Sequence, residues 1–324
     1  MVAVPGSGRE RAVRGPVSVR SRLGSAIDRH EPRSVLFAVG RSVLAGAQLS
    51  VLLFNSDTTL FADSPAVPGG VRCGGLRSVS LWCLLGDQGV GPMLARAVAI
   101  ATLVVVLIGA VPRWTCIPHW YVNFSLAAAM PLSNGGDRAA EIAALLLIPI
   151  CLGDDRKWQW NAVREPLPAW FRGSSQAGAL MLRVQVAVIY LVAATAKLSD
   201  PAWVHGRALG IVASDPEFGF PMPVRAALEP LLASDAIVAP ATWTVIAVQY
   251  MIVVAIMGGR RWRALALVLG SGLHLAIAVL LGLPSFGLTM IALLLCAANP
   301  AGPAGARRQR WSPWSQRKEE ARAH

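Results

Sequence analysis

Lys197 closes a long apolar run in this chain, and the lysine side chain can act as a base. The sequence reads YLVAATAKLSDPAWVHG from Tyr190 to Gly206, and nearly every residue from Ala177 to Val192 is apolar. Two interpretations follow from this position. Lys197 is an anchor that reaches toward the polar interface, or it lies in a dry site where loss of its proton makes it a general base. The anchor is the more common role for a lysine at the end of an apolar segment.

A second set of polar side chains lies inside apolar segments. Arg41 and Gln48 are seven residues apart and share one helical face, and His119 and Asn123 share another at a spacing of four. Polar groups in a membrane interior are expected to face other helices. These residues, together with Arg183, either line a cavity that binds a cofactor or form hydrogen bonds between helices.

His274 lies deep in another apolar run, too far from either end to reach an interface. It fits either a group that relays protons or contacts a ligand, or a neutral histidine that is hydrogen-bonded in the core. The chain has no catalytic serine elbow, no HExxH, no Walker loop and no zinc-ligand spacing. Protease, ATPase and metal-dependent chemistry are therefore not predicted.

Two further patterns lie between apolar runs. Gly135 and Gly136 permit a tight turn, and Asp137 after them either caps a helix or takes part in function. Cys73 and Cys83 share one loop and are close enough for a disulfide, with two unpaired thiols as the alternative.

The elements that must position these residues are membrane-spanning helices. The chain has 324 residues, of which 54% are hydrophobic and 15% charged, and its apolar residues come in long blocks. We expect an all-α polytopic bundle of about eight spans. The fourth and eighth are short, so they either start earlier, at Gly135 and Leu283, or are tilted or re-entrant. The expected spans are Ser34–Phe54, Pro92–Val111, Trp114–Leu132, Ala139–Leu152, Ala177–Leu198, Ala236–Met257, Ala264–Leu281 and Phe286–Ala298.

The distribution of basic residues predicts the orientation of these spans. With eight crossings, 21 of the 30 lysines and arginines fall on the side of the two termini, against five on the other side. The positive-inside rule then makes both termini cytoplasmic and argues against a nucleic-acid partner for the net charge of +12. Residues 1–33 and 300–324 are expected to be basic, disordered tails that touch anionic lipid, and 34–299 to form the membrane domain. The outer side holds nine acidic residues against five basic ones, which would attract a cationic partner.

Three stretches carry a resemblance to a known family. They are NFSLAAAMPLSNGGDRAAEIAALLLIPICLGDDRKWQW, YLVAATAKLSDPAWVHG and LHLAIAVLLGLPSFGLTMIALLL. In this order they resemble the HTTM membrane domain and, within it, the sporulation-delaying protein B-like bacterial proteins. The resemblance covers about residues 34–299. It implies a polytopic protein of the bacterial inner membrane, encoded beside a small partner protein and a secreted peptide toxin precursor, and needed to make that toxin active.

The wider superfamily includes vitamin K-dependent γ-carboxylases, and this likeness implies roles for four residues. A lysine matching Lys197 is the base that deprotonates the reduced quinone there, and a histidine matching His274 lies in the same membrane site. Trp203 and Gly206 also match and would contact a quinone or lipid. The present chain lacks the large lumenal portion of the carboxylases, so carboxylation itself is not expected.

Three functions follow as hypotheses. The first is maturation or export of a secreted antimicrobial peptide. The second is a membrane enzyme in which Lys197 acts as base on a quinone-like or lipid cofactor. The third is toxin immunity or transport without covalent chemistry.

Overall fold

The computed structural model describes residues 31–63, 65, 67–86, 89–216 and 219–299, so the expected tails at 1–30 and 300–324 lie outside the described residues. The described chain is all-α, as the sequence predicts, and its described residues contain no strand. In chain order the long helices are α2 (Val35–Phe54), α5 (Gly91–Leu107), α6 (Pro112–Ala129), α7 (Gly135–Cys151), α8 (Ala169–Leu198), α12 (Asp235–Met257), α13 (Arg260–Leu280) and α14 (Pro284–Ala297).

Each expected span corresponds to one of these helices, with shifted ends. The two short spans start early, as one sequence alternative holds, because α7 begins at Gly135 and α14 at Pro284. The helix α8 begins at Ala169 rather than Ala177, and its 30 residues extend about 45 Å. Four helices, α2, α8, α12 and α13, are long and apolar enough to cross a membrane. The crossing of the others remains a prediction.

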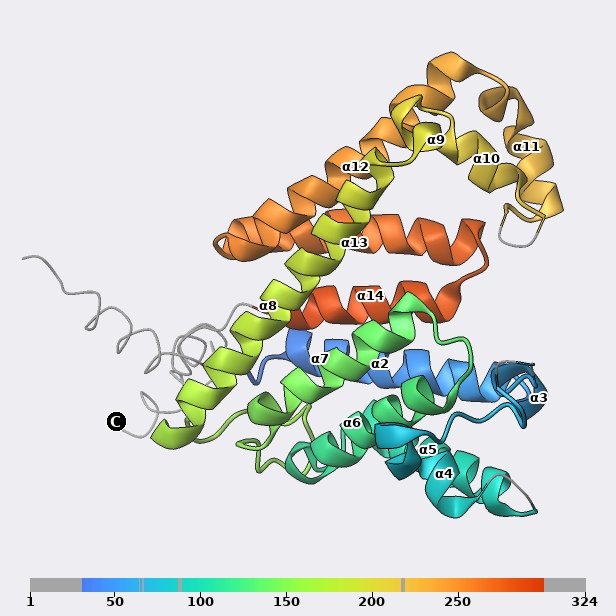
Figure 1. The fold of residues 1–324 in the computed structure, drawn as a ribbon. Coiled ribbons are helices and arrows are strands. Elements are labelled where there is room, and N and C mark those ends of the chain that lie inside the picture. Colours follow the sequence, from blue (N-terminus) through green and yellow to red (C-terminus); the bar gives the residue numbers. More distant parts are fainter. Residues whose placement is uncertain (1–30, 64, 66, 87–88, 217–218, 300–324) are drawn as a thin grey trace, which may run out of the picture.

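Two hydrophobic clusters divide the bundle. One joins α2 to α7, α8, α12, α13 and α14, and the other joins α2 to α5 and α6. In Figure 1, α13, α14 and α2 are stacked one below another, while α8 runs diagonally past them and packs against α12. Small residues such as Ala95, Ala99, Ala140 and Ala143 are fully buried at these contacts, where they let helix backbones approach closely.

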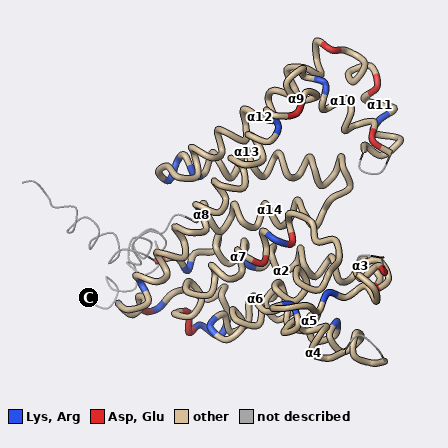
Figure 2. The backbone as a smooth tube through the Cα atoms, in the orientation of Figure 1, with Lys and Arg blue, Asp and Glu red and all other residues tan. Residues whose placement is uncertain are grey.

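The first and last described residues of the bundle meet at one end. The hydroxyl of Ser34 donates to Asn299 Oδ1 at 2.7 Å, and the amide of Asn299 donates to the carbonyl of Pro32 at 2.6 Å. We call this end the terminal end and the opposite end the loop end. Charged residues gather near both ends of the long helices and are sparse between them (Figure 2).

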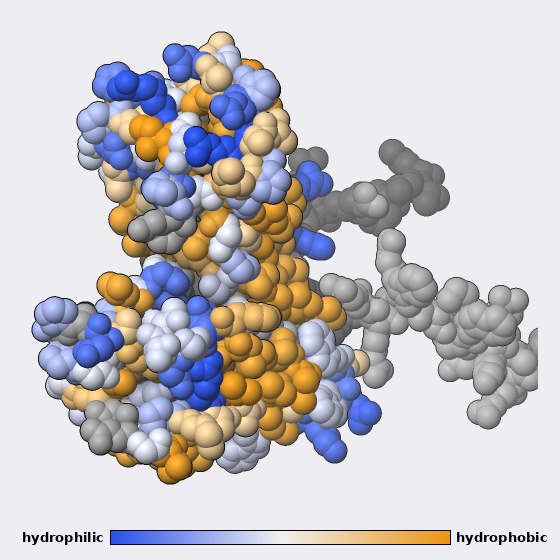
Figure 3. Space-filling view, turned by 90° about the vertical axis from the view of Figure 1, so that its right-hand side faces the viewer, coloured by the Kyte–Doolittle hydropathy of each residue, from blue (hydrophilic) through white to orange (hydrophobic). Residues whose placement is uncertain are grey.

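Short helices cover the loop end. They are α3 (Asp57–Leu60), the 3-10 helix η1 (Gly75–Val79) and α4 (Leu81–Leu85) beside α5 and α6, and α9 (Pro201–Val204), α10 (Ala208–Ser214) and α11 (Met222–Leu232) beside α12. Figure 3 looks onto this end and shows two lobes with polar surface and a broad apolar flank beside them. Polar ends and apolar flanks are what a bilayer-embedded bundle presents.

Candidate functional site

Lys197 lies in the last turn of α8 and is half-buried. Its Nζ donates to the carbonyl of Ala193 at 3.2 Å and lies 4.9 Å from the centre of the Trp203 ring. A cation near helix C-terminal carbonyls is favourable, and so is a cation over an indole face. Both contacts hold the amine where α8 turns into α9.

Gly206 holds the next turn against α12. Its φ is +72°, and a Cβ there would lie 2.7 Å from the Cβ of Ala239. Its carbonyl accepts a hydrogen bond from the hydroxyl of Thr242 at 3.1 Å, and that hydroxyl is itself buried. Only glycine meets both the backbone angle and the close approach. Gly206 therefore has a structural reason to be glycine, independent of any cofactor.

His274 is buried between α8 and α14. Its ring meets Tyr190 edge-on, with centroids 5.8 Å apart, and meets Phe286 in the same way at 5.4 Å. Among the described residues neither ring nitrogen of His274 has a hydrogen-bond partner, nor has the hydroxyl of Tyr190. Buried polar atoms without partners are uncommon in folded proteins, which makes this histidine and tyrosine pair a candidate site.

Lys197 and His274 have separate surroundings. The contacts of Lys197 come from α8 and α9, whereas those of His274 come from α8 and α14. Tyr190 and Lys197 are two helical turns apart, about 10 Å along α8. The hydrogen bonds and ring contacts of the two side chains in the described chain involve different residues, and the shared site implied by the carboxylase likeness remains a prediction.

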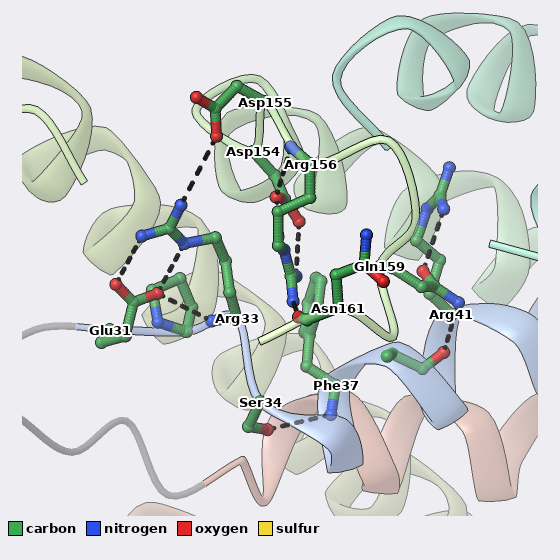
Figure 4. Close-up of polar contacts among 12 residues, drawn as sticks. Glu31, Arg33, Ser34, Phe37, Arg41, Asp154, Asp155, Arg156, Gln159 and Asn161 are labelled. Atoms are coloured by element: carbon green, nitrogen blue, oxygen red, sulfur yellow. Dashed lines mark hydrogen bonds and ion pairs between the residues drawn. The ribbon is translucent and has the colours of Figure 1, made fainter. Parts of the chain in front are cut away.

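Arg41 lies at the centre of a buried network near the terminal end. Its guanidinium donates to Thr115 Oγ1 at 2.6 Å and to Gln159 Oε1 at 3.1 Å (Figure 4). The amide of Gln159 donates to Ser42 Oγ at 2.7 Å and to the carbonyl of Ala38 at 3.1 Å. The network joins α2, α6 and the segment 153–168, and no ion pair to Arg41 occurs among the described residues.

His119 and Asn123 face the same interior, one and two turns further along α6. The amide of Asn123 donates to the carbonyl of His119 at 2.8 Å, which leaves His119 Nε2 and Asn123 Oδ1 buried without partners in the described chain. On α2, Gln48 Nε2 reaches Thr289 Oγ1 of α14 at 3.5 Å. The predicted helical faces are therefore buried, and they are only partly satisfied by hydrogen bonds between helices.

Arg183 has a structural partner. Its Nε donates to the carbonyl of Ala297 at 3.1 Å, and Arg263 reaches the carbonyl of Asn299 at 3.3 Å. Two cations thus satisfy carbonyls at the end of α14, where the helix dipole favours positive charge. A cofactor at Arg183 remains a prediction, but stabilising α14 is sufficient reason for an arginine there.

The segment 153–168 is fixed to the terminal end by charged side chains (Figure 4). Arg33 pairs with Glu31 at 2.7 Å, donates to the carbonyl of Glu165 and lies 3.9 Å from Asp155. The pair of Arg156 and Asp154, at 2.7 Å, stabilises the segment internally. Backbone contacts add to this, since Val111 N–H donates to the carbonyl of Lys157 at 2.8 Å.

At the loop end, the turn before α7 and the disulfide frame one hollow. Asn134 and Asp137 form a reciprocal capping box, so the turn of Gly135, Gly136 and Asp137 starts the helix as the capping interpretation holds. Cys73 and Cys83 form a disulfide with their Cα atoms 5.6 Å apart. A cavity of about 490 Å³ lies between these two features, and Arg72 and Asp137 are among the residues that line it.

Three polar residues described above were not among the candidates predicted from the sequence: Arg72, Gln159 and Thr242. Gln159 and Arg72 lie in loops, where sequence periodicity gives no direction for a side chain. Thr242 carries a hydroxyl within an apolar helix, and the sequence does not distinguish it from other threonines in such helices. The sequence signal for Arg72 was its position next to Cys73, because a disulfide at Cys73 would restrain the backbone of the residues beside it. No group of three or more potential metal ligands occurs in the described chain.

Two curated proteins of Bacillus subtilis strain 168 are similar to this chain over most of its length. An "Uncharacterized protein YitO" is 32% identical over 280 residues, which cover 84% of this chain and 88% of that protein. The "Sporulation-delaying protein SdpB" is 31% identical over 285 residues, which cover 88% of this chain and 87% of that protein. No family model matches, so the HTTM resemblance stays a prediction, and no solved structure matches. The identity and coverage show that this chain belongs to the sporulation-delaying protein SdpB family.

Proposed function

We propose that this chain is a multi-pass protein of the bacterial cytoplasmic membrane that is required for maturation or export of a secreted antimicrobial peptide. The observation that carries the proposal is the relationship to the sporulation-delaying protein SdpB across nearly the whole membrane domain. Apolar helices long enough to cross a bilayer support the location. A peptide toxin precursor and a small partner protein encoded nearby are the partners we propose, with membrane lipid as the surrounding solvent.

The arrangement of the bundle supports a role at the outer surface. The loop end contains a disulfide and carries two structured loops, and a disulfide persists in oxidising surroundings outside the cytoplasm. A secreted precursor would meet these loops as it leaves the membrane. The terminal end, by contrast, carries the basic segments that the positive-inside rule assigns to the cytoplasm.

Deletion of the gene tests the proposal. The medium of the deletion strain should lose the antimicrobial activity that the parent strain secretes, and a plasmid copy should restore it. The precursor should still be synthesised, as an epitope tag on it would show. Unchanged secreted activity in the deletion strain would rule the proposal out.

Toxin immunity is the competing function for a member of this family. Expression in a second strain distinguishes immunity from peptide maturation. Expression of this chain alone in a toxin-sensitive host should leave that host sensitive, because maturation protects no recipient. Survival of the host would assign the chain to immunity instead.

A further inference from the structure

The cavity at the loop end is recessed between rigid walls. One wall is the loop that carries Arg72, and the other is the turn between α6 and α7 with the start of α14. The floor comes from the end of α2, at Val51 and Asn55. A volume of about 490 Å³ is in the range of sites for small molecules and short peptide segments.

The loop that carries Arg72 is anchored to α6 at this residue and again at residues that follow it. The N–H of Arg72 itself donates to the carbonyl of Ala129 at 3.0 Å. Further along, Tyr121 Oη donates to the carbonyl of Val79 at 2.8 Å, and the N–H of Leu81 donates to Ser125 Oγ at 3.0 Å. The disulfide from Cys73 closes the intervening segment. The backbone at Arg72 is therefore held in place before any ligand arrives, which reduces the backbone entropy lost on binding.

The charge balance inside the cavity favours an anion. Arg72 is the only cation in the lining, and the described residues provide it with no ion pair. The one carboxylate in the lining, Asp137, is 5% exposed and accepts the N–H of Asn134 at 3.0 Å within the capping box. Nearby Asp57 is paired with Arg96. The guanidinium of Arg72 is thus the charged group left for a ligand.

The remaining lining indicates what carries the anionic group. Asn55 Nδ2 bonds the carbonyl of Val51 and Asn134 Oδ1 belongs to the capping box, so Asn55 Oδ1 and Asn134 Nδ2 are the amide atoms that suit a peptide backbone. Leu60, Met130 and Leu132 present apolar surface. The cavity opens among the loops of the bundle end rather than on the apolar flank, so a peptide reaches it more directly than a lipid does. An arginine in a rigid recess recognises a terminal carboxylate through paired N–H donors.

From this arrangement we infer that the cavity binds the C-terminal carboxylate and the last few apolar residues of a peptide, with Arg72 as the carboxylate-binding residue. The inference rests on the proposed function, because it takes the secreted peptide or its precursor as the natural ligand. The net-negative outer side would attract the basic body of such a peptide while its carboxylate reaches Arg72.

Binding of a labelled probe tests the inference directly. The full chain in nanodiscs of zwitterionic lipid is titrated with a fluorescent tetrapeptide of alanine, valine and leucine that ends in a free carboxylate, and with the same peptide ending in an amide. The free acid should bind about tenfold or more tightly than the amide. Arg72→Gln should remove this difference, and Arg72→Lys should retain part of it because lysine keeps the charge without the paired donors.

Arg77→Gln is the matched control. Arg77 lies in the same loop, is exposed, and is not in the lining of the cavity; it lines a second hollow of about 460 Å³ that also borders Arg72. This variant should bind the free acid as the parent does, and its Cys73–Cys83 bond should form as it does in the Arg72 variants. Equal binding of acid and amide, no binding of either, or equal effects at both arginines would overturn the inference. Displacement of the acid by phosphatidylglycerol but not by amidated peptide would instead assign the cavity to a lipid phosphate, which also overturns it.

The two proposals fail separately. If deletion abolishes peptide secretion while Arg72→Gln secretes normally, the function stands and the cavity inference falls. If deletion leaves secretion intact, the proposed function falls whatever the probe shows.

Discussion

At the residue scale, Lys197 makes two contacts that either a lysine or an arginine can make. An arginine at this position keeps the charge near the carbonyls at the end of α8 and can stack on Trp203. We therefore expect Lys197→Arg to retain peptide secretion and Lys197→Met to lower the membrane level of the protein, as immunoblots and activity assays would show. An inactive Lys197→Arg protein present at the normal level would instead require a tunable amine and favour base chemistry.

Gly206 gives a residue-scale prediction on stability. Gly206→Ala should lower the free energy of unfolding by about 1–3 kcal/mol, because alanine is strained at a positive φ and its Cβ meets Ala239. Gly272→Ala on α13 is the control, since nothing lies within 4 Å of a Cβ there and alanine favours helix by about 1 kcal/mol. Thermal unfolding in detergent, followed by circular dichroism, should shift in opposite directions. Equal shifts would show that the turn at Gly206 is not tight.

At the element scale, the segment 153–168 acts as part of the bundle although it is not a helix. Gln159 inserts beside Arg41, and Gly109 has a φ of +83° where a Cβ would lie 2.5 Å from the Gln159 side chain. The turn between α5 and α6 and this segment thus fit each other. A single buried amide connects three parts of the fold.

Removing that amide should release the segment. Gln159→Ala removes the acceptor of Arg41 Nη1 and a second partner of Ser42 Oγ and of the Ala38 carbonyl, at about 1–3 kcal/mol for the buried guanidinium nitrogen left without its partner. Trypsin added to inverted membrane vesicles should then cut after Lys157 about tenfold faster than in the parent. Asn161→Ala is the control because that side chain is exposed. Unchanged cleavage of Gln159→Ala would mean that the contacts of Arg33 with Glu165 and Asp155 hold the segment without the amide.

At the scale of the whole molecule, aromatic side chains mark the terminal end. Five exposed tryptophans lie near helix starts or in the segment at this end, beside basic residues. They are Trp114, Trp158, Trp160, Trp170 and Trp262. Tryptophan prefers the interface between hydrocarbon and water, and lysine and arginine prefer its cytoplasmic side. The tryptophans mark an interface without giving its side, and the basic residues support the prediction that the terminal end faces the cytoplasm.

Cysteine labelling measures this orientation. Leu132→Cys, at a position 91% exposed in the turn between α6 and α7, should react with an impermeant maleimide in intact spheroplasts. Asn161→Cys should react only after the membrane is opened. The parent protein provides a low background because Cys116, Cys151 and Cys296 are buried. Labelling in the reverse pattern would invert the topology, and labelling of both from outside would show that α7 does not cross the membrane.

Much of the fold could be predicted from the sequence, because apolar runs are a direct record of which segments avoid water. Each expected span corresponds to a helix, and local signals placed some ends well: Pro284 starts α14, and the capping box starts α7. The ends of α5 and α8 were predicted less well. A turn set by Gly109 and Val111 ends α5 earlier than predicted. The eight residues before Ala177 extend α8 at its start, because tertiary packing supports this part of the helix.

The sequence by itself determined the all-α membrane class, the charge asymmetry and the pairing of Cys73 with Cys83 as one of two alternatives, since these depend on composition and on distance along the chain. Only the tertiary structure decided which polar groups meet. It showed that the contacts of Lys197 and of His274 involve different residues. It also showed that Arg183 bonds a carbonyl at the end of α14 and that Arg72 lines a cavity. The physical reason is that helix periodicity fixes the face of a side chain but not the element opposite it, and loops have no periodicity at all.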